Sequence, residues 1–68
     1  MGRVMIYNNK VNQFWGRMAN ARLDFAYRGW SYMKDDNGKR IQVVWYSFDT
    51  ITDLRKARMI IDLYKLGI

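Results

Sequence analysis

The fold is decided by the stretch WSYMKDDNGKRIQVVWY, residues 30–46. It contains two runs rich in aromatic and β-branched residues, a composition typical of strands. Between the runs lies Asn37-Gly38, a dipeptide that suits the two positive φ angles of a type I′ turn. The stretch therefore predicts a β-hairpin over about residues 29–47, with these two residues as its loop.

Counting outward from a two-residue loop gives the cross-strand register, and a slip of one residue would change every pairing. Each acidic residue beside the turn then faces a basic one, Asp36 opposite Lys39 and Asp35 opposite Arg40. The next pairs outward include Trp30 opposite Trp45. We assign to the core the face that carries Trp30, Tyr32, Ile41, Val43 and Trp45. The candidate working face carries Ser31, Met33, Asp35, Arg40, Gln42, Val44 and Tyr46.

Helical periodicity appears on both sides of the hairpin. Apolar residues at i, i+3, i+4 and i+7 predict a helix over about residues 10–23, through Val11, Phe14, Trp15 and Met18. A second such pattern predicts a helix over about residues 51–66, through Leu54, Ala57, Ile61 and Tyr64. Thr50 and Asp53 resemble a capping box at its start, and Gly67 is placed where a left-handed residue would end it.

A third strand is expected beside the hairpin. Residues 3–7, RVMIY, form a short β-prone run that can supply it. Residues 19–28 fit either a continued helix or a strand in which Leu23, Phe25 and Tyr27 alternate with polar residues. We favour the helix as far as Leu23 and leave residues 24–28 open. Either choice gives one α+β domain over residues 1–68, a small antiparallel three-stranded sheet packed with two helices.

The composition limits the chemistry of this chain. It has 68 residues and neither cysteine nor histidine, so we expect no disulfide, no metal site and no cofactor. The Asp35-Asp36 pair is the only pair of adjacent carboxylates, and its place beside a turn favours a structural role. We therefore expect a protein that is not an enzyme. No apolar run approaches the ~20 residues that span a bilayer, so we expect a cytoplasmic protein, in the host cytoplasm if the chain is viral.

The charge indicates the kind of partner. Twelve Lys and Arg against six Asp give a formal net charge of +6, which attracts nucleic acid or an acidic protein surface. Arg and Gln on a sheet face can make bidentate hydrogen bonds to base edges, and a β-ribbon fits the major groove of DNA. The predicted nucleic-acid contacts are Ser31, Met33, Lys34, Lys39, Arg40, Gln42 and Tyr46, with secondary basic contacts from Lys10, Arg17 and Arg22. The alternative is an ordinary solvated sheet face, or a face that the first helix covers. The aromatic residues could also include base-stacking platforms, although core packing is the commoner use.

Residues 30–57, WSYMKDDNGKRIQVVWYSFDTITDLRKA, resemble the second half of the arm-type DNA-binding domain of tyrosine recombinases and the related plant ethylene-response-factor domain. The shared pieces are the hairpin over Asp35 to Arg40, the turn Phe48 to Thr50, and the helix from Ile51. The resemblance implies DNA bound in the major groove by the sheet. The third strand of that family is basic and polar, whereas residues 41–48 are largely hydrophobic here.

Two other functions stay open on the sequence. Small, basic, non-enzymatic α+β proteins also include phage or mobile-element factors that bind and inhibit a host nuclease, polymerase or CRISPR effector. A third class is a structural or assembly subunit, including a homodimer, that buries its hydrophobic sheet face between copies.

Overall fold

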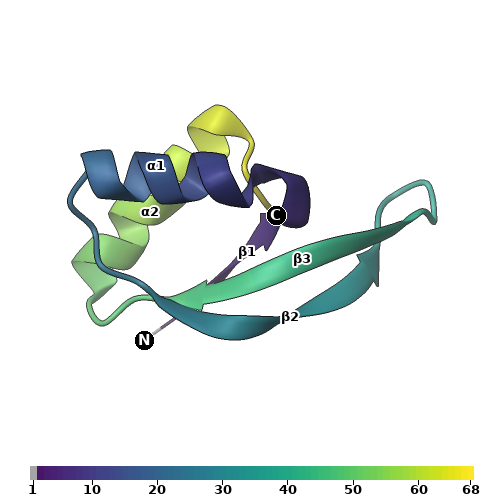
Figure 1. Cartoon of the computed structure of the whole chain (residues 1–68), viewed down its shortest axis with the longest axis horizontal. Helices are drawn as coiled ribbons and strands as arrows, with labels where there is room; N and C mark the ends of the chain where they lie inside the picture. Colours follow the sequence, from purple (N-terminus) through teal and green to yellow (C-terminus); the bar gives the residue numbers. More distant parts are fainter. Residues whose placement is uncertain (1) are drawn as a thin grey trace.

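The computed structural model of this chain describes residues 2–68 as a three-stranded sheet with two helices. In chain order its elements are β1 (Arg3–Tyr7), the 3₁₀ helix η1 (Asn8–Lys10), α1 (Val11–Asn20), β2 (Ala26–Lys34), β3 (Arg40–Ser47) and α2 (Ile51–Tyr64). The sheet is antiparallel with the strand order β1-β3-β2. Both helices lie on one side of it, and the β2-β3 hairpin extends beyond them (Figure 1). The α+β class and the third strand are confirmed.

The hairpin turn has three loop residues, not the predicted two. The Asp35 N–H donates to the Lys39 carbonyl at 2.9 Å, and the Gly38 N–H donates to the Asp35 carbonyl at 2.9 Å. Of the loop residues only Gly38 has a positive φ, at 79°, as in three-residue hairpin loops that end on a left-handed residue. The Asp35 carboxylate accepts hydrogen bonds from the backbone N–H groups of Asn37 and Lys39, at 2.9 and 2.8 Å. These bonds hold the carboxylate inside the turn.

The longer loop shifts the cross-strand register by one residue. Trp30 pairs with Val44 and Tyr32 with Gln42, so the predicted pairing of Trp30 with Trp45 is wrong. The shift places Trp30 and Tyr32 on the same side of the sheet as Val44, because directly paired residues share a face. Val44 packs under the helices, and this side of the sheet is the helix-side face.

The predicted core of the hairpin is wrong in two respects. Trp30 and Tyr32 remain 52% and 49% exposed, because they lie on an edge strand that has no buried residue. Tyr46, which we expected on the working face, is 2% exposed. Its ring stacks on Phe14 with centroids 4.8 Å apart, and its hydroxyl accepts a hydrogen bond from Trp15 Nε1 at 2.9 Å.

The core fills the space between the sheet and the two helices. β1, β3 and both helices contribute to it, as do the segments that follow α1, β3 and α2. Its buried members are Val4, Ile6, Phe14, Met18, Leu23, Val44, Tyr46, Phe48, Leu54, Ala57, Ile61 and Leu66. Phe25 packs against this cluster between Phe14 and Tyr46, at ring distances of 5.3 and 5.2 Å. Burial of these side chains is the main favourable contribution to the stability of the fold.

The opposite, open face of the sheet carries a second, thinner apolar layer. Val43 is fully buried there between its cross-strand partners Tyr7 and Ser31. Trp45 is half-buried, and its Nε1 donates to Ser31 Oγ at 3.1 Å. Among residues 2–68, no helix covers this face (Figure 1).

The first helix ends earlier than its periodicity predicts. α1 ends at Asn20, and Arg22 has a left-handed φ of 56°. The Leu23 N–H donates to the Met18 carbonyl at 3.0 Å, and the Arg22 N–H donates to the Ala19 carbonyl at 3.1 Å. This pair of bonds is a Schellman motif, which turns the chain out of the helix. The prediction that the first helix continues as far as Leu23 is therefore wrong. Residues 26–28, which we left open, belong to β2.

The second helix begins as predicted and ends two residues early. Thr50 Oγ1 accepts a hydrogen bond from the Asp53 N–H at 3.1 Å, which confirms the cap. α2 ends at Tyr64, and Lys65 takes the left-handed conformation with φ 54°. We expected Gly67 in that position. Gly67 instead pairs with Ile6, so the C-terminal residues run beside β1.

Candidate nucleic-acid interface

A β-bulge in the edge strand β2 brings three aromatic side chains to one face. Tyr27 pairs with Tyr46 and Trp30 with Val44, so two residues of β2 lie opposite a single residue of β3. Gly29, inside this bulge, has a φ of 100°, which other residues rarely adopt. Strand side chains alternate, so without the extra residue Tyr27 and Trp30 would lie on opposite faces.

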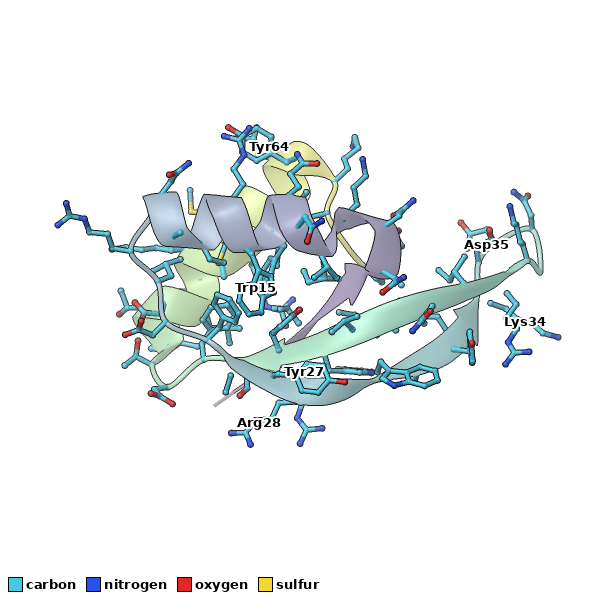
Figure 2. The ribbon with its side chains drawn as sticks, in the orientation of Figure 1. Trp15, Tyr27, Arg28, Lys34, Asp35 and Tyr64 are labelled. Carbon is cyan, nitrogen blue, oxygen red and sulfur yellow. The ribbon has the colours of Figure 1, made fainter. Side chains whose placement is uncertain are left out.

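We call Tyr27, Trp30 and Tyr32 the aromatic row. The three side chains are 59%, 52% and 49% exposed, so each offers ring surface to solvent. The Trp30 and Tyr32 rings meet edge to face, with centroids 5.2 Å apart and planes at 86°. Tyr27 packs against buried Tyr46 at 6.2 Å, and Figure 2 shows its side chain alongside β2. The row therefore starts at the core and follows the hairpin outward.

Two cationic side chains lie at the end of the aromatic row that is nearer the hairpin tip. The Arg40 guanidinium carbon lies 3.7 Å from the centre of the Tyr32 ring, a cation–π contact that positions the charge. Lys34 is the cross-strand partner of Arg40, and both are exposed. Figure 2 shows Lys34 at the tip end of the hairpin. Two cations on adjacent strands would repel each other, so an anion bound between them would be favourable.

The predicted contact residues divide between different surfaces. Lys34, Arg40 and Gln42 share the helix-side face, and exposed Lys39 follows the turn. Ser31 and Met33 pair with Val43 and Ile41 on the open face. Tyr46 is buried and unavailable to a ligand, so its prediction as a contact residue is wrong. One ligand surface cannot include the whole predicted set.

The secondary basic residues lie on the helical layer. Arg17 of α1 places its guanidinium carbon 3.7 Å from the centre of the Tyr64 ring, and Arg22 is exposed after the helix. Lys10 lines a hollow of about 410 Å³ between η1 and β3, together with Gln42 and Lys65. This hollow brings one secondary residue close to one predicted hairpin residue.

Sequence reasoning missed the aromatic row as a surface. It placed Trp30 and Tyr32 in the core and left Tyr27 in an undecided segment. The signal that could have found it is Gly29, because an isolated glycine within a strand pattern often marks a bulge. A bulge there puts Tyr27 in phase with Trp30.

No group of three or more acidic or other metal-binding side chains within residues 2–68 is placed to hold a metal ion. Across the same residues, no helix has both the length and the apolar character needed to span a membrane. No protein-family model, curated protein or solved structure matches this chain. The resemblance to arm-type DNA-binding domains therefore remains a prediction.

Proposed function

We propose that this chain is a non-enzymatic nucleic-acid-binding module, with DNA as the favoured ligand, that binds through the helix-side face of its projecting hairpin. The observation that carries the proposal is the exposed aromatic row with Arg40 stacked at its end. Burying these rings in the domain itself would stabilise the fold, and the fold leaves them about half exposed.

The chemistry of this surface suits a nucleic acid. Aromatic rings offer faces on which bases stack, and guanidinium and ammonium groups bind phosphates. The net charge of +6 adds a long-range attraction for a polyanion. The outer part of the hairpin extends beyond the helices, so a ligand could reach the end of the row that carries the two cations without meeting them (Figure 1).

Fluorescence anisotropy with labelled single-stranded and duplex DNA, at about 50 and 200 mM salt, tests the proposal. The test variant is Lys34→Ala with Arg40→Ala. Its matched control is Arg55→Ala with Lys56→Ala, which removes the same charge from exposed positions on α2. We expect the wild-type protein to bind DNA with an affinity that falls as salt rises. The hairpin variant should lose much more of this affinity than the control variant. Absence of binding at low salt would refute the proposal, and equal losses would refute the hairpin as its site.

A protein partner is the second candidate, and one observation favours it. Met59 and Leu63 of α2 are each 72% exposed and line a shallow hollow with Ile60 and Asp62. Neighbouring exposed apolar side chains on one surface are typical of protein-binding surfaces. A factor that inhibits a host machine, or a self-associating subunit, would use this surface. Met59→Asp with Leu63→Asp should then abolish partner binding or dimerisation, measured by light scattering, and leave DNA binding intact.

A further inference from the structure

We infer that the ligand of the hairpin is a single strand, whose bases stack on Trp30 and Tyr27 while Arg40 contacts a phosphate. This inference rests on the proposed function and specifies its ligand class. It depends on how the aromatic row is oriented and on which residues share its face.

The aromatic row offers ring faces, which bases in a duplex cannot reach. Within a duplex each base is stacked on its neighbours, whereas the bases of a single strand can be splayed onto aromatic side chains. Trp30 meets Tyr32 edge to face at 86°, so the Tyr32 ring does not stack on the indole. Tyr27 has the largest exposed fraction of the three, at 59%. Sheets that bind RNA stack about two or three bases on such rings.

Tyr32 has a different role from Trp30 and Tyr27. One face of its ring is already occupied by the Arg40 guanidinium, 3.7 Å from the ring centre. Tyr32 therefore serves to hold Arg40 beside the place where bases would stack. A guanidinium fixed in this way keeps its N–H groups free for a phosphate oxygen, and its planar fork suits bidentate contact. Lys34, on the adjacent strand, supplies a second cation for the same backbone.

This surface is less suited to hydrogen bonding with the base edges of a duplex than to stacking on the bases of a single strand. A ribbon in the major groove needs several polar side chains on the face that meets the base edges. Arg40 and Gln42 are on the helix-side face, but Ser31 and Met33 are on the other. The rings of Trp30 and Tyr32 lie on the same face as Arg40 and Gln42. Their flat surfaces can stack on the face of a base but cannot hydrogen-bond to the edge of a base pair. The bulge at Gly29 extends these stacking surfaces by one more ring, that of Tyr27.

The test compares oligo(dT), oligo(U) and a duplex of equal length. Trp30→Ala should weaken single-strand binding about five-fold or more and duplex binding less than about two-fold, since one stacked base is worth ~1–3 kcal/mol. The control is Tyr64→Ala, which removes an exposed aromatic residue from α2. Trp30→Phe should retain most of the affinity because it keeps a ring. The two oligonucleotides distinguish single-stranded DNA from RNA as the source of the ligand.

A second readout does not depend on the folding of the alanine variant. Trp15→Phe with Trp45→Phe leaves Trp30 as the only tryptophan. Its fluorescence should be quenched when oligo(dT) or oligo(U) binds. Unchanged Trp30 fluorescence on saturation, or a duplex bound as tightly as the single strands, would overturn this inference while the proposed function stands. Failure of all three nucleic acids to bind at low salt would overturn both.

Discussion

The Arg40 guanidinium carbon lies 3.7 Å from the centre of the Tyr32 ring, and both residues are exposed. The contact exists because the three-residue turn places Tyr32 opposite Gln42, two residues along β3 from Arg40 on the same face. With the predicted two-residue loop, Tyr32 and Arg40 would lie on opposite faces. One turn residue therefore determines which cation meets the aromatic row.

Arg40 and Tyr32 should be energetically coupled. We expect a coupling free energy of about 0.5–1 kcal/mol, the range for an exposed cation–π contact. A double-mutant cycle with Arg40→Ala and Tyr32→Leu, read by urea unfolding, measures it. Arg17 and Tyr64 form a comparison cycle with the same separation of 3.7 Å. A coupling energy of zero in the Arg40 cycle would contradict the contact.

The Asp35 carboxylate should stabilise the hairpin, whereas its neighbour should not. Asp35 accepts two backbone N–H groups within the turn. Hydrogen bonds to a charged group are worth ~1.5–3 kcal/mol, less when exposed, so Asp35→Ala should cost about 1–2 kcal/mol. Asp36→Ala is the matched control, with an expected change within about 0.5 kcal/mol. Equal losses in chemical denaturation would favour the two-residue turn instead.

Glycine at the ends of both helices should stabilise the fold. Arg22 and Lys65 hold left-handed φ angles of 56° and 54°, a conformation that costs non-glycine residues roughly 1–2 kcal/mol. Arg22→Gly and Lys65→Gly should each raise the free energy of unfolding by up to about 1 kcal/mol. Arg55→Gly, inside α2, should lower it by about the same amount. Thermal unfolding of the three variants checks this, and destabilisation by the first two would contradict the left-handed conformation of Arg22 and Lys65.

Tyr46 should matter for stability and not for ligand binding. Its hydroxyl accepts the Trp15 Nε1 hydrogen bond at 2.9 Å. Tyr46→Phe removes that acceptor, so we expect a loss of about 0.5–1.5 kcal/mol in unfolding free energy. DNA affinity, measured by anisotropy, should stay within about two-fold of wild type because the ring is 2% exposed. A large loss of affinity in a folded variant would restore Tyr46 as a contact residue.

The sequence predicted the elements well because their signals are periodic and local. The Val11 to Met18 spacing, the RVMIY run and the Thr50 cap each predicted an element that the structure contains. The predicted register was wrong because Asn37-Gly38 suits a two-residue loop, whereas the Asp35 carboxylate accepts hydrogen bonds from two backbone N–H groups and favours a loop of three residues. The spacing of apolar residues cannot predict which loop length the hydrogen bonds of the Asp35 side chain will favour.

The prediction of which hairpin face is exposed was wrong for a related reason. Whether Trp30 is buried depends on which part of the sheet the helices cover. Trp30 lies on the edge strand β2, in a hairpin that extends beyond both helices (Figure 1). The pattern of residues 30–46 distinguishes two faces but does not say which one the helices cover. The bulge at Gly29 then adds Tyr27 to the exposed row, an effect that strand alternation alone cannot predict.

The most direct test of the proposed site is a titration of ¹⁵N-labelled protein with a short single-stranded oligonucleotide, followed by amide chemical shifts. We predict that the large shifts fall on residues 27–34 and 40–42, at the aromatic row and its two cations. Shifts that cluster on α2 around Met59 and Leu63, or that spread evenly over the basic surface, would contradict the hairpin as the binding site.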